Sequence, residues 1–208
     1  MYQEIKSSIE GFDIDSVPNE RKPLLDELVD YIVHRIREGE SVSLNFICTH
    51  NSRRSHLSQV WAQTMAGYFD IRDVHCYSGG TEATAMFPVV GKTLSSQGFA
   101  ISKLADQKNP IYAIRYDTVS PSVIAFSKTY DDEFNPKSDY GAIMTCASAD
   151  KGCPVVIGAQ VRLPIRYVDP KVSDGTPDQA KVYLERSVQI GTEMKYVFHQ
   201  VKASLHKA

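Results

Sequence analysis

The fold is decided by residues 42–55, VSLNFICTHNSRRS, in which a short apolar run gives way to a polar loop. Val, Leu, Phe and Ile in such a run are typical of a buried strand, and this run ends at Cys48. Apolar residues then recur at helical spacing from Leu57 to Tyr68, which predicts an amphipathic helix. The loop therefore joins a strand to a helix, and Cys48 stands at the carboxyl end of the strand.

This loop has the residues needed to bind an oxyanion. Cys48 and Arg54 stand six positions apart, with small or polar residues between them. Backbone N–H groups at a helix N-terminus converge on one point, where the helix dipole favours negative charge. The same field favours the thiolate form of Cys48, which is the nucleophilic form. Arg54 can hold two oxygens of a tetrahedral anion, and Ser55 can donate a hydrogen bond to the thiolate.

The residues expected to bind the oxyanion are Thr49, His50, Asn51, Ser52, Arg53 and Arg54. The alternative is a buried cysteine at a strand end, followed by an ordinary helix cap.

Strands and helices alternate along the chain, which predicts an α/β fold with a central parallel sheet of about four strands flanked by helices. Ligands bind beyond the carboxyl ends of the strands in such sheets, and Cys146 also follows an expected strand. The expected elements are an added N-terminal helix over 24–36, strands over 42–47, 74–77 and 140–145, helices over 57–68 and 87–97, a hairpin of 111–116 with 122–127, and a helix from about 178. The buried stripe expected on the last helix is Ala180, Leu184, Val188, Gly191, Met194, Phe198 and Val201.

Composition narrows the class of protein. The chain has 208 residues, and 23 basic against 25 acidic side chains leave a formal charge of −2. That balance gives no electrostatic reason to expect nucleic acid or an anionic membrane as partner. The polar N-terminus has no apolar centre of a secretory signal, and four cysteines are too few for a disulfide scaffold. We therefore expect a cytoplasmic protein.

The chain is expected to divide into an N-terminal helical extension, residues 1–40, and a main domain, residues 41–208, with an insertion at about 108–138. Within the insertion, residues 126–132 are dense in polar and aromatic groups. They are predicted to form an exposed hairpin with a solvated turn, or a lid over the loop.

The loop resembles the phosphate-binding loop shared by low-molecular-weight protein tyrosine phosphatases and thioredoxin-coupled arsenate reductases. Two further segments are similar to that family: residues 77–83, YSGGTEA, and Val168-Asp169-Pro170. The resemblance covers about residues 43–200, interrupted by the insertion. It implies the family's fold, with Cys48 as nucleophile, Arg54 as oxyanion ligand and Asp169 as general acid.

The reductase branch needs further cysteines that relay a disulfide. Cys146 and Cys153 stand seven residues apart, which is the spacing of the relay pair in that branch. By resemblance, Cys146 attacks the adduct of Cys48 with arsenic, Cys153 attacks the Cys48–Cys146 disulfide, and thioredoxin reduces the final bridge. The alternative is a structural pair or half of a zinc site, but no further ligands stand nearby in the sequence. We therefore expect no metal and no tightly bound cofactor, with thioredoxin as partner.

Three functions stay open at this point. The first is an arsenate reductase with the three-cysteine relay, and the second is a phosphatase that hydrolyses phosphomonoesters through a phosphocysteine. Lys171 and Val172 stand where phosphatases of this type carry tyrosines, which counts against phosphotyrosine. The third is an oxyanion sensor without turnover, because His50 replaces a glycine usual in the family. Arg53 replaces a cysteine found in many members and is expected to add positive charge beside the anion site.

Overall fold

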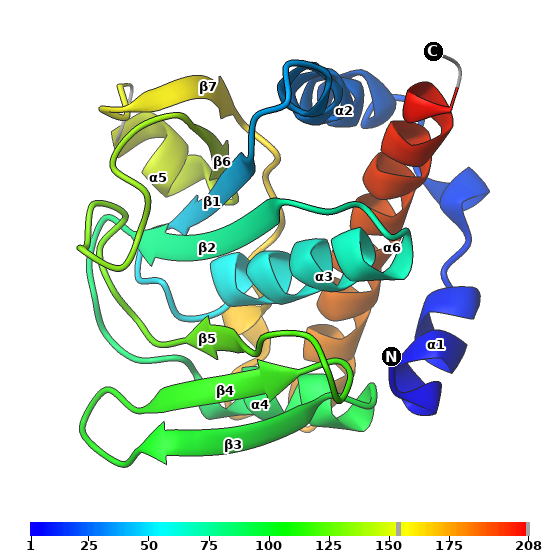
Figure 1. Ribbon diagram of the computed structural model, residues 1–208. Helices are drawn as coiled ribbons and strands as arrows, with labels where there is room; N and C mark the ends of the chain where they lie inside the picture. The colour runs from blue at the N-terminus through cyan, green and yellow to red at the C-terminus, as the bar shows by residue number, and fades with distance from the viewer. Residues whose placement is uncertain (153–154, 207–208) are drawn as a thin grey trace.

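The central layer is a four-stranded parallel sheet in the order β2-β1-β6-β7 (Figure 1). In the computed structural model, which describes residues 1–152 and 155–206, these strands are β1 (Val42–Cys48), β2 (Val74–Gly80), β6 (Tyr140–Met144) and β7 (Ala159–Leu163). Each neighbouring pair is parallel, so all four carboxyl ends meet at one edge. The predicted fold class is confirmed.

Helices cover both faces of this sheet. The long helices α2 (Lys22–Arg37), α3 (Arg54–Tyr68) and α6 (Gln179–Leu205) bury their apolar faces in one core with Leu44 and Phe46 of β1. Ile47, which points to the other side of the strand, packs in a second core with Ala149 of the short helix α5 (Ala147–Gly152). Strand β1 is therefore largely buried on both faces, and the face of Ile47 is the more polar one because it also carries Ser43 and Asn45.

A second, antiparallel sheet in the order β3-β4-β5 lies beside α3 (Figure 1). Its strands are β3 (Ala100–Ala105), β4 (Ile111–Arg115) and β5 (Val123–Ala125). The predicted hairpin is the β4–β5 pair, whereas β3 was not predicted because its residues are mostly exposed and show no apolar alternation. Gln59 of α3 links the two sheets, since its Nε2 donates to the carbonyls of Cys76 and Ile124.

The remaining helices are α1 (Gln3–Glu10) and α4 (Pro88–Ser96), with short 3-10 turns η1 (Ile14–Ser16) and η2 (Pro170–Ser173). The helix predicted over 87–97 is α4, and the N-terminal helix predicted over 24–36 is α2. Helix α1 was not predicted, because only Ile5 and Ile9 mark its buried face.

The stripe predicted for α6 is correct in its second half and wrong in its first. Gly191, Met194, Phe198 and Val201 are buried, whereas Ala180, Leu184 and Val188 are exposed. Tyr183, Ser187 and Ile190 face the core instead. The reason is polar bonding: Ser187 accepts a hydrogen bond from the indole of Trp61 and donates to Gln97.

The N-terminal extension shares the main core. Ile5, Ile9 and Phe12 belong to the same buried cluster as Trp61, and the ring of Phe12 lies edge-on to Trp61 at 5.0 Å between centroids. The division of the chain at residue 40 stays a prediction, but the extension packs on the domain.

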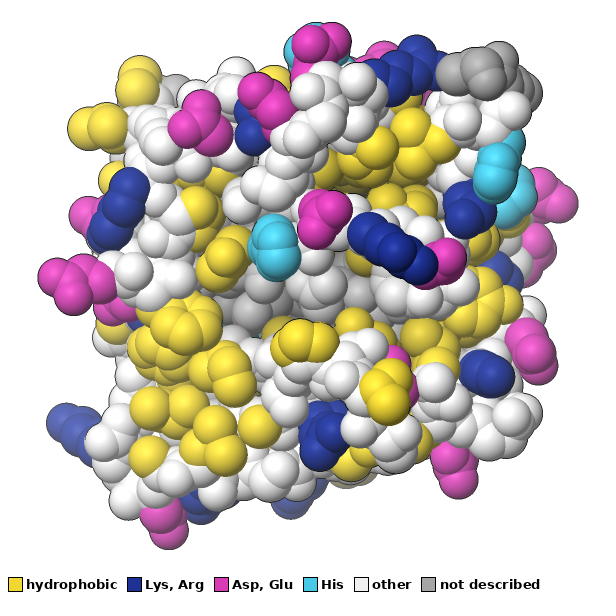
Figure 2. Space-filling model, viewed as in Figure 1, with side chains coloured by type: hydrophobic (Ala, Val, Ile, Leu, Met, Phe, Trp, Pro, Cys, Tyr) yellow, Lys and Arg dark blue, Asp and Glu magenta, His cyan; other side chains and the backbone are white. Residues whose placement is uncertain are grey.

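The surface carries both signs of charge. On the face drawn in Figure 2, basic and acidic side chains are interspersed, and apolar side chains gather at the lower left, where Figure 1 places the small sheet. Within the described residues, none of the helices has the length and apolar character needed to cross a bilayer.

Gly191 tests the packing of the extension. A Cβ there would lie 2.5 Å from Cε2 of Phe12, a buried ring held against Trp61. We expect Gly191→Ala to lower the free energy of unfolding by roughly 1–3 kcal/mol through overpacking. The matched control is Gly91→Ala in α4, whose Cβ would meet nothing closer than 3.7 Å. That control should raise stability by about 0.5–1 kcal/mol through helix propensity. Equal gains in urea denaturation for both variants would contradict this packing.

Candidate active site

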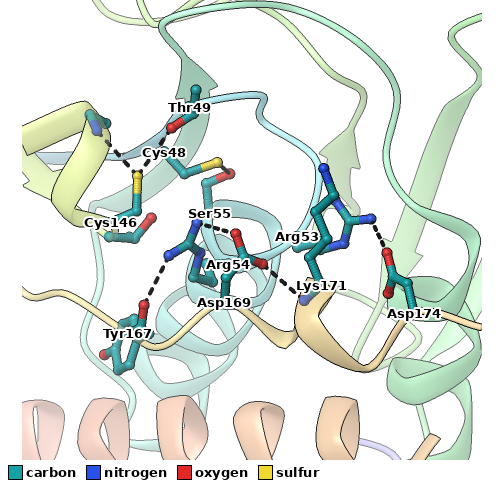
Figure 3. A network of polar contacts seen from close by, with 12 residues as sticks. Cys48, Thr49, Arg53, Arg54, Ser55, Cys146, Tyr167, Asp169, Lys171 and Asp174 are labelled. Carbon is teal, nitrogen blue, oxygen red and sulfur yellow. Dashed lines mark hydrogen bonds and ion pairs between the residues drawn. The ribbon is translucent and has the colours of Figure 1, made fainter. Parts of the chain in front are cut away.

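Three segments meet at the carboxyl edge of the parallel sheet. The loop after β1 begins at Cys48, the segment after β6 begins with Cys146, and the segment after β7 leads to Asp169. Because these three strands are parallel neighbours, residues about 100 positions apart in sequence lie around one site (Figure 3). The structure brings Cys48, Cys146 and the Arg54–Asp169 pair together at this edge.

The thiol of Cys48 lies inside the loop and is 4% exposed. Its Sγ is 3.1 Å from Oγ of Ser55, and Ser55 in turn accepts a hydrogen bond of 2.9 Å from Nδ2 of Asn51. Because the amide of Asn51 donates to a lone pair of the Ser55 hydroxyl oxygen, the hydroxyl proton of Ser55 is free to point at the sulfur of Cys48. The hydroxyl of Ser55 is therefore placed to donate a hydrogen bond to the sulfur of Cys48.

Asn51 shapes the loop through its backbone as well. Its φ is +43°, in the left-handed region that Asn tolerates better than most residues. Its Oδ1 accepts a hydrogen bond of 2.9 Å from the backbone N–H of Lys128, and the whole residue is buried. The loop conformation therefore depends on one side chain bonded at both ends.

The segment after β5 supports the loop from outside. Oγ of Ser127 donates to the carbonyl of His50 at 2.9 Å, and Ser127 and Lys128 are each only 2% exposed. The prediction that residues 126–132 form an exposed hairpin is wrong for this part of the segment. It packs against the loop because its backbone and Ser127 satisfy polar groups of the loop that would otherwise be unpaired.

Arg54 connects the loop to the segment after β7 that carries Asp169, the expected general acid. Its Nη2 donates to Oδ2 of Asp169 at 2.5 Å, and its Nη1 donates to the carbonyl of Tyr167 at 2.9 Å (Figure 3). Its Nε is buried and has no hydrogen-bond partner in the described part of the chain. An oxyanion in the loop would satisfy this donor.

Arg53 points elsewhere. Its Nε donates to the hydroxyl of Tyr183 at 2.5 Å and its Nη2 to Oδ2 of Asp174 at 2.6 Å, while the guanidinium stacks 4.2 Å from the ring of Phe87. Partial burial opposes the charge, but the bonds to Tyr183 and Asp174 outweigh it, and the pKa of Arg53 is raised. The expected extra positive charge beside the anion is therefore neutralised by Asp174.

Cys146 lies against the loop. Its Sγ is 3.4 Å from Oγ1 of Thr49, the residue after Cys48, and it accepts a hydrogen bond from the backbone N–H of Ala149. The residue is 1% exposed. The other expected relay cysteine, Cys153, lies outside the described residues. Cys76 is buried mid-strand, and burial raises the pKa of its thiol, which disfavours the thiolate.

Two further predicted residues, His50 and Ser52, differ in exposure. The side chain of His50 is half exposed and lies 3.8 Å from a carboxylate oxygen of Glu82, whereas Ser52 is buried and its carbonyl accepts from the N–H of Phe87. Among the described residues, no cluster of three His, Cys, Asp or Glu could hold a metal ion. The roles assigned to the site residues stay predictions.

The sequence analysis missed Ser127, Lys128, Asp174 and Tyr183, which hold the loop and the Asp169 segment. Only proximity in the fold connects them to the site. The density of polar and aromatic residues in 126–132 was the one available signal.

Comparisons with known proteins bear on the whole fold. No family model matches the chain. An arsenate reductase from Halalkalibacterium halodurans is 29% identical over 152 residues, covering 72% of this chain and 90% of that protein. A solved structure of a YwlE mutant from Bacillus subtilis has a TM-score of 0.53 at 14% identity, covering 78% of this chain and 99% of its own. A low-molecular-weight phosphotyrosine phosphatase from Vibrio cholerae O395 has a TM-score of 0.52 at 11% identity, covering 80% and 98%.

The resemblance to the low-molecular-weight phosphatase and arsenate reductase family is confirmed. The structural matches establish the family's fold, and the sequence match extends along most of an arsenate reductase. The small antiparallel sheet is an addition to the parallel sheet and its helices.

Lys128 offers a test of how the loop is supported. Its Nζ lies 4.3 Å from the centroid of the Phe126 ring and 5.2 Å from that of Phe134, and burial lowers its pKa from 10.5 to about 8. Asp132 opposes this shift, and the neighbouring His56 is kept neutral by its own burial. At neutral pH the lysine is charged in both states, so folding carries the cost of burying the charge. Above pH 10.5 it is neutral in both states, and that cost disappears.

We therefore expect Lys128→Met to raise the free energy of unfolding at neutral pH by roughly 2–3 kcal/mol. The gain over the parent should shrink as the pH rises from about 8 to 10.5. The exposed Lys92→Met variant is the control and should show no such dependence. A gain that is independent of pH in denaturant titrations would show that Lys128 is not buried as a charge.

Proposed function

We propose that this protein is an arsenate reductase that uses Cys48 as nucleophile and a disulfide relay through Cys146 and Cys153. The observation that carries the proposal is the buried thiol of Cys146, 3.4 Å from the hydroxyl of Thr49, the residue next to the nucleophile. A phosphatase needs no second thiol there. The similarity to an arsenate reductase along 90% of that protein's length supports the same choice.

The first step is substitution at arsenic. The Cys48 thiolate, stabilised by Ser55, attacks arsenate and forms a sulfur–arsenic bond, while an arsenate oxygen protonated by Asp169 leaves as water. Arg54 and the N–H groups of the loop hold the remaining oxygens. Asp169 is suited to this role because it follows β7 and lies 2.5 Å from Arg54, the expected oxyanion ligand.

The next steps move two electrons. The Cys146 thiolate attacks the sulfur of Cys48, the sulfur–sulfur bond forms, and the electron pair of the sulfur–arsenic bond stays on arsenic, which leaves as arsenite. Cys153 then attacks Cys146 and releases the Cys48 thiolate. Thioredoxin, as the external reductant, opens the Cys146–Cys153 disulfide by the same exchange chemistry.

The second candidate is a phosphatase of the same family. The set of Cys48, Arg54 and Asp169 meets its needs: a nucleophile, an oxyanion ligand and an acid for the leaving group, with water completing turnover. Val172, which follows the Asp-Pro pair closely, is 79% exposed and offers no aromatic wall for a phenol. This favours arsenate over phosphotyrosine as substrate.

Cysteine variants separate the two candidates. With thioredoxin, thioredoxin reductase and NADPH, arsenate should cause NADPH oxidation, and Cys48→Ser, Cys146→Ser and Cys153→Ser should each abolish multiple turnover. Slow hydrolysis of an aryl phosphate should be lost only in Cys48→Ser, because only Cys48 bonds to phosphorus. Cys76→Ser is the matched control, a buried thiol away from the loop, and should retain both activities.

Absence of arsenate-dependent NADPH oxidation, together with rapid phosphomonoester hydrolysis, would identify the phosphatase instead. If both assays are silent while phosphate or arsenate raises the melting temperature, the protein is an oxyanion sensor.

A further inference from the structure

The segment after β7 is held at both ends by consecutive arginines. At its start, Arg54 binds the carboxylate of Asp169; at its end, Arg53 binds the carboxylate of Asp174 (Figure 3). Between them, η2 forms a compact turn, with the N–H of Lys171 bonded to Oδ1 of Asp169 and the N–H of Asp174 bonded to the carbonyl of Lys171. The two attachments are therefore joined by a short hydrogen-bonded turn.

The carboxylate of Asp174, at the second attachment, accepts hydrogen bonds from three side chains. Its Oδ2 accepts from Arg53, while its Oδ1 accepts from the hydroxyl of Tyr183 at 2.6 Å and from Gln179 at 3.0 Å. These bonds together outweigh the effect of burial and lower the pKa of Asp174. Tyr183 and Gln179 belong to α6, so Asp174 is joined both to the loop and to the longest helix of the fold.

An oxyanion changes only the first of these attachments. The guanidinium of Arg54 is expected to bind two oxygens of the anion. Only its Nε lacks a partner among the described residues, so the second bond to the anion must share Nη1 or Nη2, which now bond to the carbonyl of Tyr167 and to Asp169. If Nη2 of Arg54 bonds to the anion instead, the carboxylate of Asp169 keeps only the hydrogen bond from the backbone N–H of Lys171, which belongs to the same segment. The attachment of Arg53 to Asp174 does not involve the anion and remains.

We propose that Arg53 is a positioning residue: with Asp174 and Tyr183 it tethers the 169–174 segment, so that Asp169 stays over the site when the oxyanion occupies Arg54. The inference rests on the proposed function only in taking the loop as the oxyanion site and Asp169 as the acid. It also accounts for an arginine where the family often has cysteine, because a cysteine cannot reach and pair with a carboxylate across the loop.

Hydrogen exchange tests the tether without relying on turnover. The probe is inorganic phosphate, and the reporter is the peptide spanning residues 167–176. In the parent, saturating phosphate should leave exchange in this peptide little changed. In Arg53→Met, phosphate should raise that exchange several-fold, because the segment then loses both attachments. Asp174→Asn and Tyr183→Phe break the same network from the other side and should shift exchange in the same direction.

The matched control is Tyr196→Phe. It removes a phenol–carboxylate hydrogen bond of 2.8 Å, to Asp26, from the same helix but away from the site. This variant should respond to phosphate as the parent does. Because three variants interrupt the tether, failure of one to fold leaves the test intact.

A leaving-group series tests the positioning role in catalysis. Acid catalysis matters little for aryl phosphates whose phenols are strongly acidic and matters most for those whose phenols are weakly acidic. Arg53→Met should therefore reduce kcat by less than about twofold for substrates with strongly acidic phenols. For substrates with weakly acidic phenols the reduction should be roughly tenfold or more. Arg53→Lys should recover part of this loss. A merely structural role would reduce kcat equally across the series.

The outcomes are distinct. An equal response to phosphate in the parent and in Arg53→Met, or a uniform loss across the series, overturns the tether while leaving the proposed function in place. Failure of phosphate to raise the melting temperature of the parent overturns both, because the loop is then not an oxyanion site. A parent that binds phosphate but hydrolyses no aryl phosphate leaves the tether to be decided by hydrogen exchange.

Discussion

The two hydrogen bonds of the Asn51 side chain hold the loop from which the rest of the site is built. One bond reaches inward to Ser55 and so orients the hydroxyl toward Cys48; the other reaches outward to the backbone of Lys128. The residue is fully buried in a left-handed conformation, so its amide must be satisfied on both sides. The position of the nucleophile thus depends on a segment some 77 positions away in sequence.

The parallel sheet brings the other participants to that loop. Since β1, β6 and β7 are neighbours in register, the thiols of Cys48 and Cys146 and the carboxylate of Asp169 emerge at one edge. All three described cysteines are buried, so they differ in what surrounds them rather than in exposure. Cys146 is in contact with the loop, whereas Cys76 lies mid-strand beneath apolar cover with a raised pKa. Position in the sheet therefore distinguishes Cys146, the proposed relay thiol, from Cys76.

The sequence was informative where function and local structure coincide. The strand, loop and helix around Cys48 could be predicted because apolar periodicity and turn chemistry are local, and Asp169 and the cysteine pair followed from resemblance. Lys128, Asp174 and Tyr183 could not be predicted, because their partners lie 77 to 130 residues away and no periodic pattern encodes such contacts. The same limit explains the first half of α6, where Tyr183 and Ser187 face inward to satisfy polar partners while Leu184 is left in solvent. Strand β3 was missed because its apolar residues do not alternate with polar ones, and helix α1 because only Ile5 and Ile9 mark its buried face.

In the proposed relay, Cys146 forms a disulfide bond with Cys48 as arsenite leaves. Trapping that disulfide is the most direct test. Cys153→Ser, treated with arsenate without reductant, should release one equivalent of arsenite per chain and stop. Mass spectrometry of the unreduced tryptic digest should then show the Cys48 peptide joined to the Cys146 peptide, a bond that requires Cα atoms within roughly 7 Å. Detection of a free Cys146 thiol after arsenite release, or continued turnover by Cys153→Ser at the parent rate, would contradict the relay.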